Sequence, residues 1–350
     1  SLCYKKLNMS KKNSSVNLSS LINDREDLRE IYLSFKNKLS RYKKKSYLIG
    51  VSGGPDSMAL AALSKIYSLE SNVKIYYTLV DHSIRKNSAK EAKQVKKLLK
   101  KHNINLRIFK NKKLIKKNVQ AEARLVRYEI FSKICNKNNI SYILTAHNLE
   151  DQVETFFIRL SRGSGLTGLS SMKQLTQLSR KISLLRPLLE VKKQDLVKIS
   201  KIVFGRYLKD PSNSNTKFLR TRIRNLEKPL QKSGISYDQI FKSINNLASS
   251  KNILEKYYTQ VSKENIKKSK NLVILNLTKF KTLDEEVKIR LINISIKHLN
   301  RNYYNIRAKK VINLINNLKK KSYTKSTLGG CILVKQGEKL LFKKEKKSHF

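Results

Sequence analysis

Residues 47–57 read Tyr-Leu-Ile-Gly-Val-Ser-Gly-Gly-Pro-Asp-Ser. The apolar run at 47–51 is typical of a buried strand, and the residues from about Ser57 to Leu69 are expected to form a helix. The adjacent glycines between them let the backbone turn tightly, so that successive N–H groups point into one concavity. The hydroxyls of Ser52 and Ser57 add donors, and the following helix presents its positive end. The loop at Ser52–Ser57, called the phosphate loop below, is therefore predicted to bind phosphate groups.

The phosphate loop departs from the commonest phosphate-binding motif in two ways. It lacks the lysine of G-x-x-x-x-G-K-[ST], and it carries Asp56, which would repel a phosphate unless it helps to hold a magnesium ion. An ordinary strand-to-helix turn, with Asp56 as a helix cap, is the alternative. Two glycines, two serines and an aspartate in one turn favour the nucleotide site. The residues predicted to bind the cofactor here are Ser52, Gly53, Gly54, Pro55, Asp56 and Ser57.

Apolar runs typical of strands alternate with amphipathic stretches typical of helices on both sides of this loop. Further strands are expected at 73–80, 106–109, 142–146 and 182–185, and helices at 21–45, 88–101, 119–137, 151–160 and 193–203. Such alternation with short connections predicts an α/β fold with an open, mostly parallel, doubly wound sheet. Ligands bind such sheets at the carboxyl ends of the strands, where the phosphate loop and His147 both fall.

Three segments are expected along the chain. Residues 1–45 form a basic N-terminal extension with a helix, and residues 46–232 form the α/β domain. Residues 235–350 are predicted to form a second, mainly helical domain that ends in a β-hairpin around Gln336 and Gly337.

A second group of polar residues, at 146–155, follows the strand expected at 142–146 and reads Ala-His-Asn-Leu-Glu-Asp-Gln-Val-Glu-Thr. Asp151 and Glu154 lie three residues apart and share one face of a helix. Beside Asp56, these carboxylates are candidates to coordinate magnesium or to orient an incoming amine. Acidic residues in a first helical turn are also ordinary partners of the helix dipole, and the pattern alone leaves both interpretations open.

A third motif runs from Arg159 to Leu169 and contains three glycines and two arginines. With Arg162 and Gly163 near its start, this loop is a candidate clamp for an anion. A flexible connector after the preceding helix is the alternative.

The chain is strongly basic, with 76 Lys and Arg against 25 Asp and Glu and a net charge of +51 over 350 residues. This excess favours an anionic partner, nucleic acid first, although a biased residue composition produces the same excess. Cys3, Cys135 and Cys331 are far apart, which argues against a zinc ribbon, an iron–sulfur site or a disulfide framework. No apolar run is long enough to span a membrane, and a cytoplasmic protein is expected.

These motifs together resemble a known superfamily. The phosphate loop fits S-G-G-x-D-S, the signature of the PP-loop (N-type ATP pyrophosphatase) enzymes, which split ATP into AMP and pyrophosphate and activate a carbonyl-type oxygen as an adenylate. H-N-x-x-D-Q-x-E-T at 147–155, followed by R-G-S-G-x-x-G-L at 162–169, is similar to the tRNA(Ile)-lysidine synthase family. The other matching segments are Asp81-His82-Ser83-Ile84-Arg85, Ala123-Arg124 with Arg127-Tyr128, Arg186-Pro187-Leu188-Leu189, Asp210-Pro211-Ser212-Asn213 and Arg222-Ile223-Arg224.

The resemblance implies a ligase that uses ATP and Mg²⁺ to join free L-lysine to an isoleucine tRNA with a CAU anticodon. In that family the carbon-2 oxygen of the wobble cytidine attacks the α-phosphate of ATP, and pyrophosphate leaves. The ε-amine of lysine then attacks carbon 2, AMP leaves, and lysidine is formed. This tRNA and lysine are the expected partners, no membrane is involved, and the architecture is compatible with a homodimer. Another PP-loop tRNA-modifying enzyme, such as a cytidine thiolase, is the alternative, which the unpaired Cys135 in an expected helix disfavours.

The same resemblance implies roles for individual residues. The phosphate loop holds pyrophosphate, Asp56 and Asp151 are candidate magnesium ligands, and Asp151 and Glu154 receive the lysine ammonium, which must lose a proton before it attacks. The other expected site residues are Arg124, Arg127 and Arg162 for phosphate charge or tRNA contact, His82 and His147 for the adenine or ribose side, and Gly163 beside the nucleotide.

The resemblance also has limits. Glu150 stands where the family often has an aspartate. The segment at 46–232 would be catalytic, and the segment at 235–350 would bind the tRNA or substrate. Longer members carry a further C-terminal domain that grips the acceptor stem, and the chain is expected to end before it.

Overall fold

The computed structural model describes residues 13–85, 87–111, 119–208, 216–300 and 306–345. The chain divides into two compact units, Ser1–Leu247 and Ala248–Phe350. The sequence placed this boundary near residues 232–235, whereas the division falls inside the long helix α11 (Tyr237–Asn265). The first turns of α11 belong to the first unit because Ile244 is buried in a cluster with Val153.

The first unit is built on a six-stranded sheet with strand order β3-β2-β1-β4-β6-β5. The strands are β1 (Ser46–Gly50), β2 (Lys74–Asp81), β3 (Leu106–Lys110), β4 (Tyr142–Leu144), β5 (Leu175–Gln177) and β6 (Ser183–Leu185). All neighbouring pairs are parallel except β5 with β6. The open, mostly parallel sheet is confirmed. β5 is not expected from the sequence, because three residues with one apolar side chain carry no strand periodicity.

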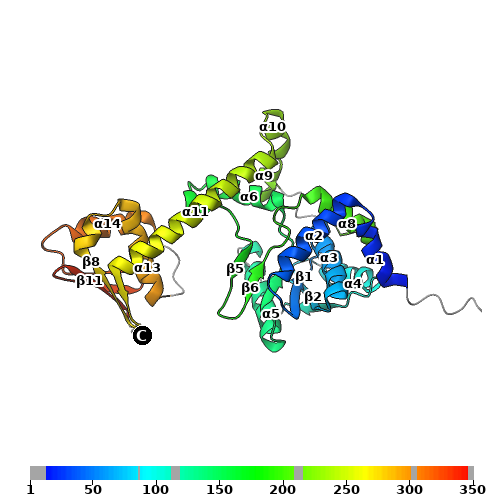
Figure 1. Ribbon diagram of the computed structural model, residues 1–350, viewed down its shortest axis with the longest axis horizontal. Helices are drawn as coiled ribbons and strands as arrows, with labels where there is room; N and C mark the ends of the chain where they lie inside the picture. The colour runs from blue at the N-terminus through cyan, green and yellow to red at the C-terminus, as the bar shows by residue number, and fades with distance from the viewer. Residues whose placement is uncertain (1–12, 86, 112–118, 209–215, 301–305, 346–350) are drawn as a thin grey trace, which may run out of the picture. The chain divides into compact units, whose positions relative to one another are not determined.

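Helices cover both faces of this sheet. Tyr47 and Ile49 of β1 point into one core, which they share with α3 (Pro55–Ser71), α4 (Ser88–Lys100) and α8 (Lys193–Phe204). Leu48 points the other way, into a second core formed with α5 (Val119–Lys137) through Phe131 and Ile134. The alternation of β1 residues between two cores is the mark of a doubly wound sheet. Figure 1 shows α3 and α8 with α1 and α2 on the first face.

The helix expected at 21–45 is two helices. α1 (Asn13–Asn23) ends and α2 (Glu26–Ser40) begins within three residues, with the break at Asp24 and Arg25. Both helices pack against α3, so the apolar periodicity continues across the break and hides it from a sequence pattern.

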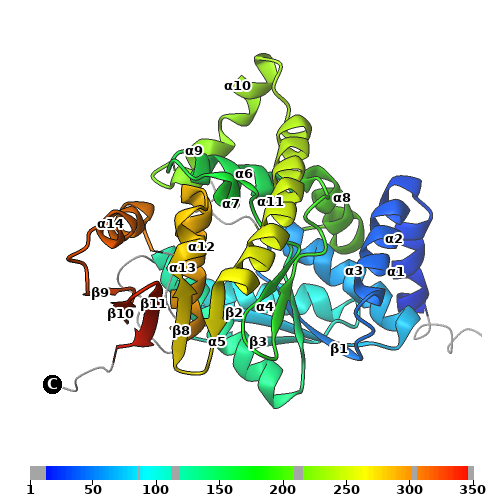
Figure 2. The same ribbon diagram turned by 60° about the vertical axis from the view of Figure 1, so that its left-hand side comes forward.

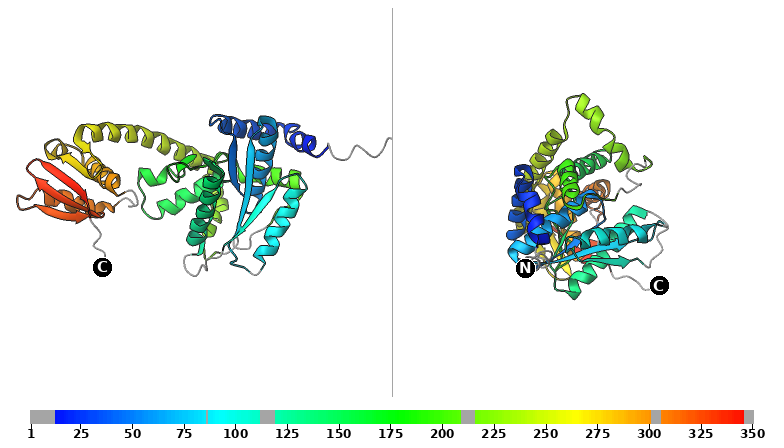
Figure 3. Two further views of the ribbon diagram at one scale, coloured as in Figure 1. Left: turned by 90° about the horizontal axis from the view of Figure 1, so that it is seen from below. Right: turned by 90° about the vertical axis from the view of Figure 1, so that its right-hand side faces the viewer.

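The second unit combines helices with a five-stranded antiparallel sheet of order β7-β8-β11-β10-β9. Its elements after α11 are β7 (Ile266–Lys268), β8 (Leu272–Asn276), α12 (Leu277–Lys281), α13 (Glu285–Leu299), α14 (Ala308–Leu318), β9 (Lys325–Leu328), β10 (Cys331–Gln336) and β11 (Lys339–Lys344). Figure 2 shows α13 against β8, and the hairpin of β10 and β11 lies at the red end of the chain in Figure 3. The hairpin is expected from the sequence, whereas β7 and β8 lie in a segment expected to be mainly helical. β8 pairs with β11, which is more than 60 residues further along, so no local pattern shows that pairing. β7 joins the sheet by pairing with β8.

The remaining helices of the first unit are α6 (Leu149–Leu160), α7 (Leu166–Leu169), α9 (Leu219–Arg224) and α10 (Glu227–Lys232). No helix in the described part of the chain is long and apolar enough to cross a lipid bilayer. In sheet order β1, β4 and β6 are neighbours, so the segments that follow their carboxyl ends lie side by side. This edge carries the phosphate loop, His147 and Arg186.

Candidate active site

The phosphate loop is shaped by hydrogen bonds among its own groups. The Ser52 backbone N–H donates to Ser57 Oγ over 3.0 Å, and Ser57 Oγ in turn donates to the Gly54 carbonyl over 3.0 Å. Gly53 has φ +88°, and an added Cβ there would lie 2.6 Å from a methyl group of Val95. Ser57 is buried while Ser52 is exposed, so the loop keeps an open side above α3. A tight turn that is open on one side and leads into a helix N-terminus fits the phosphates of a nucleotide.

Asp56 lies in the first turn of α3 with one carboxylate oxygen, Oδ1, buried and without a hydrogen-bond partner in the described residues. Burial is the largest influence on its carboxyl group and raises the pKa to about 6; Asp151 raises it too, whereas Lys193 and Arg224 oppose the shift. A buried carboxylate oxygen without a donor is a costly arrangement that a bound cation would relieve.

The opening turn of α6 is fixed by a capping box. Asn148 Oδ1 accepts from the Asp151 N–H over 2.9 Å, and Asp151 Oδ2 accepts from the Asn148 N–H over 3.1 Å. Glu150 turns instead to the start of α8, where its Oε2 accepts from the Lys193 N–H over 2.9 Å. Burial raises the pKa of Glu150 to about 7. The side chains of 148–151 therefore orient two helix starts at the sheet edge.

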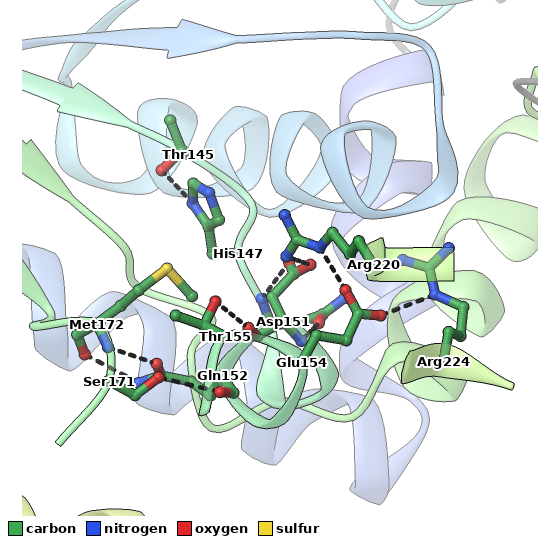
Figure 4. A network of polar contacts seen from close by, with 11 residues as sticks. Thr145, His147, Asp151, Gln152, Glu154, Thr155, Ser171, Met172, Arg220 and Arg224 are labelled. Carbon is green, nitrogen blue, oxygen red and sulfur yellow. Dashed lines mark hydrogen bonds and ion pairs between the residues drawn. The ribbon is translucent and has the colours of Figure 1, made fainter. Parts of the chain in front are cut away.

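Glu154 is 1% exposed and holds two arginines from α9. Arg224 Nε donates to Glu154 Oε1 over 2.7 Å, and Arg220 Nε donates to Glu154 Oε2. Arg220 Nη2 also donates to Asp151 Oδ1 over 2.7 Å, so its guanidinium bridges the two carboxylates (Figure 4). Charge-assisted pairs of this kind are strong and directional. Asp151 and Glu154 are the expected receivers of the lysine ammonium, and Asp151 is also a candidate magnesium ligand. Each carboxylate oxygen of these two residues already has a hydrogen-bond partner.

His147 sits at the end of β4 and accepts or donates one hydrogen bond, with Thr145 Oγ1 2.9 Å from its Nδ1 (Figure 4). Burial, followed by the charges of Arg186, Arg124, Arg220 and Arg127, lowers the pKa of His147 to about 3. The imidazole is therefore neutral at physiological pH and is suited to hydrogen bonding rather than to charge stabilisation.

His82 follows β2, and neither ring nitrogen has a hydrogen-bond partner in the described residues. Burial, then the charge of Arg127, lowers its pKa, while Asp81 raises it. The neighbourhood of His82 and Arg127 was not evident from the sequence spacing. Two unpartnered ring nitrogens leave room for a ligand that offers both a donor and an acceptor.

The glycine loop at 159–169 is held by Arg159, which donates to the carbonyls of Gly168 over 2.6 Å and Ser171 over 2.9 Å. Arg162 and Gly163 are exposed in the turn after α6, eleven and twelve residues beyond Asp151. The structure does not place them with the other expected site residues. The matching segment Asp210-Pro211-Ser212-Asn213 lies outside the described residues.

The fit of the expected cofactors differs between ATP and Mg²⁺. The phosphate loop has the open turn and helix start that a nucleotide phosphate requires. No group of three or more His, Cys, Asp or Glu side chains among the described residues could hold a metal ion alone. Mg²⁺ is commonly held by one or two carboxylates together with substrate phosphates, and Asp56 beside the loop fits that pattern. Asp151 would have to give up Arg220 to take part.

Arg220 and Arg186 are not among the site residues expected from the sequence. Arg220 and Arg224 are four residues apart and share one face of α9, which is a visible signal. Their carboxylate partners are about 70 residues away and only the fold brings them together.

Known proteins resemble this chain in sequence. The PP-loop domain family matches residues 26–229. The chain is 32% identical over 324 residues to "tRNA(Ile)-lysidine synthase" of Wolbachia pipientis wMel, which covers 90% of this chain and 75% of that protein. The protein of the same name from Orientia tsutsugamushi (strain Boryong) is 38% identical over 185 residues, 52% of this chain and 41% of that one.

One solved structure supports the fold. "U34-tRNA thiolase NcsA from Methanococcus maripaludis with its [4Fe-4S] cluster" matches with a TM-score of 0.53 and 16% identity, over 63% of this chain and 80% of that chain. At this identity the likeness concerns the arrangement of the sheet and helices alone.

Proposed function

The chain belongs to the tRNA(Ile)-lysidine synthase family of PP-loop proteins, and from this membership we propose that it joins lysine to carbon 2 of the wobble cytidine of a CAU-anticodon isoleucine tRNA. As a member it is a ligase that modifies tRNA with ATP. The observation that carries the finer proposal is the convergence, at one sheet edge, of the phosphate loop with the acidic side chains of Asp56, Asp151 and Glu154.

The adenylation half of the reaction uses the phosphate loop. The cytidine carbon-2 oxygen attacks the α-phosphate of ATP, a new oxygen–phosphorus bond forms, and the bond to pyrophosphate breaks. The N–H groups of the loop bind the departing pyrophosphate, and the start of α3 favours its charge. Mg²⁺ bound with Asp56 would neutralise phosphate charge. Asp56 Oδ1 is buried and has no hydrogen-bond partner among the described residues, so it is available to such a cation.

The lysine half of the reaction uses the carboxylates of α6. We assign the substrate ammonium to Asp151 and Glu154, which now hold the guanidinium of Arg220. A substrate ammonium carries the same charge as that guanidinium, so it replaces Arg220 without leaving the buried Glu154 unpaired. The ε-amine attacks carbon 2 after it loses a proton, and AMP leaves with the former cytidine oxygen.

The alternative, tRNA cytidine thiolation, is disfavoured by the placement of Cys135. This thiol is fully buried inside α5, and burial raises its pKa to about 12. A thiolate is the reactive form of cysteine, and this environment opposes its formation. Cys331 is buried in the second unit, and Cys3 lies outside the described residues.

We propose that the second unit binds the tRNA or substrate, and that the positive charge of the whole chain supports this binding. The net charge of +51 provides affinity for the RNA backbone, and that affinity falls steeply with salt. The wobble base has to leave the anticodon stack to reach the sheet edge, at a cost of a few kcal/mol. We place this work in the cytoplasm.

Incorporation of labelled lysine into an isoleucine tRNA transcript with a CAU anticodon tests the proposal. With ATP and Mg²⁺ present, we expect label that survives mild base, because a carbon–nitrogen bond on the base is stable where an aminoacyl ester is not. A transcript with a CAG anticodon is the matched control and should take up none. If ATP is cleaved to AMP and pyrophosphate but no lysine enters the RNA, the PP-loop chemistry stands and lysine is the wrong nucleophile.

A further inference from the structure

We propose that Thr145 is a positioning residue for His147. Its hydroxyl donates to Nδ1 of the imidazole, which places the ring proton on Nε2 and leaves Nε2–H as the donor that His147 offers to a substrate. The family resemblance puts His147 near the nucleotide but gives no role to Thr145. This inference deepens the proposed function and rests on it, because a donor at this edge matters only if the reaction takes place there.

The extended backbone after β4 brings the two side chains together. β4 ends at Leu144, but the Thr145 N–H still donates to a carbonyl of β6 over 3.1 Å, and Asn148 has the extended angles φ −120° and ψ −174°. Side chains along an extended segment alternate between its two sides. Leu144 and Ala146 face the core shared with α3, so Thr145 and His147 face the opposite side, which α5 covers.

The two side chains are joined by one hydrogen bond. Thr145 Oγ1 lies 2.9 Å from His147 Nδ1 (Figure 4). Among the residues that the structure describes, neither side chain makes another hydrogen bond. The contact at Nδ1 therefore fixes the orientation of the ring and leaves Nε2 for a ligand.

The surroundings of His147 exclude the protonated, charged ring. Burial, followed by the charges of four nearby arginines, lowers the pKa of His147 to about 3. The imidazole is therefore neutral and carries one proton, either on Nδ1 or on Nε2. The two tautomers differ in function, because one presents a donor at Nε2 and the other presents an acceptor.

The hydroxyl of Thr145 decides between these tautomers. A hydroxyl always carries one hydrogen, and Nδ1 is the acceptor that the fold provides for it. If Nδ1 were protonated, the Thr145 hydrogen would have no acceptor in the described part of the chain, and an unpaired donor costs more than an unpaired hydroxyl lone pair. The arginines around the ring also favour an anionic ligand at Nε2, and an anion accepts hydrogen bonds. Both arguments place the proton on Nε2.

A neutral N–H of fixed direction is useful at a site where charge develops on an oxygen atom. It binds that oxygen without adding net charge, and it needs no reorientation during the reaction. A ring that exchanged tautomers would present a lone pair to the same anion part of the time and repel it. Thr145 prevents this exchange, so it acts on the reaction through His147.

Variants of the full chain test this role. Thr145→Val keeps the shape of the side chain and removes the hydroxyl, whereas Thr145→Ser keeps the hydroxyl. Thr282→Val is the matched control, since it removes an exposed hydroxyl that donates to the Lys279 carbonyl over 2.9 Å. Each change is also made in a His147→Gln background. The readouts are lysine incorporation into a CAU-anticodon tRNA transcript, thermal midpoints to verify folding, and ¹⁵N shifts of labelled histidine without substrate. The His147 signals are those that His147→Gln removes.

Thr145→Val should lower kcat for lysine incorporation by about ten- to a hundredfold with the KM values little changed, while Thr145→Ser and Thr282→Val should stay within about threefold of the parent. In the His147→Gln background, Thr145→Val should cause no further loss. The ¹⁵N shifts of the parent should show Nε2 protonated, and in Thr145→Val both ring nitrogens should shift toward a mixture of tautomers.

Three results would overturn the proposal. Equal losses in the parent and His147→Gln backgrounds would show that Thr145 does not act through His147. A proton on Nδ1 in the parent would contradict the assigned tautomer, and a Thr145→Val protein as active as Thr282→Val would remove the positioning role. The ¹⁵N shifts need no substrate, so they still decide the geometry if the parent incorporates no lysine and the proposed function fails.

Discussion

Asp56 is a single site residue whose burial lowers the stability of the folded protein. Its pKa is raised to about 6, chiefly by burial, from an ordinary value of 3.8. A carboxyl group whose pKa is higher in the folded state destabilises the fold as pH rises between those two values, and the full cost applies above pH 6. A bound cation lowers that pKa again, so the cost disappears only when the site is filled.

At pH 7.5 the free energy of unfolding of Asp56→Asn should therefore exceed that of the parent by about 1–2 kcal/mol, which raises its unfolding temperature. The variant should also lose its activity. At pH 4 the difference in stability should shrink, because the parent is then largely protonated as well. Thermal melts at both pH values check this. Asp24→Asn, at an exposed position, is the control and should change little. A variant that melts earlier than the parent at pH 7.5 would contradict the account.

Glu154 stabilises the fold through its ion pairs with Arg220 and Arg224. Glu154→Gln leaves two guanidiniums without their buried counter-ion, which should destabilise the fold by about 2–4 kcal/mol. A double-mutant cycle with Arg224→Gln in urea should give a coupling energy of about 1–3 kcal/mol. Additive effects would mean that the ion pair contributes no net stability.

The loop that connects the elements β1 and α3 depends on Gly53 more than on Gly54. Gly53 has φ +88° and an added Cβ would meet Val95 at 2.6 Å, whereas at Gly54 the nearest atom is 3.7 Å away and φ is −73°. Gly53→Ala should lower stability by more than about 1 kcal/mol and weaken ATP binding, while Gly54→Ala should leave stability nearly unchanged. Urea unfolding of the two variants measures this directly. Equal destabilisation would show that the positive φ of Gly53 is not what the loop requires.

Much of the α/β unit can be predicted from the sequence because each helix or strand shows its periodicity within its own residues. The expected helix at 119–137 has the bounds of α5, and the expected strand at 106–109 differs from β3 by one residue. The break at Asp24 and Arg25 carries no glycine or proline, so the pattern does not show it. β8 depends on pairing with the distant strand β11, which local periodicity cannot reveal, and β7 joins the sheet through β8.

In the site, too, the parts formed by consecutive residues can be predicted and the parts formed by distant residues cannot. The phosphate loop is continuous in sequence, so its glycines and serines identify it. The pairing of Arg220 with Asp151 and Glu154 joins residues 66 and 69 positions apart, and only the tertiary fold brings them into contact. The roles of Asp151 and Glu154 as lysine receivers stay predictions.

The strong positive charge acts at the scale of the whole molecule. With a net charge of +51, binding of a tRNA transcript should weaken by about 10³-fold or more between 50 and 200 mM salt. ATP binding without RNA contacts few charges and should change by less than about tenfold. Filter binding and equilibrium dialysis at matched salt concentrations check the contrast. A tRNA affinity independent of salt would show that the basic excess is not a binding surface.

The adenylated cytidine is the central claim, and transfer of an oxygen atom tests it most directly. A CAU-anticodon RNA carrying ¹⁸O at carbon 2 of the wobble cytidine would be turned over with ATP, Mg²⁺ and lysine, and the AMP analysed by mass spectrometry. If the cytidine oxygen attacks the α-phosphate, one ¹⁸O should appear in AMP for each lysine that enters the RNA. Unlabelled AMP together with lysine incorporation would mean that the oxygen leaves by another route, and that the nucleotide does not activate the base.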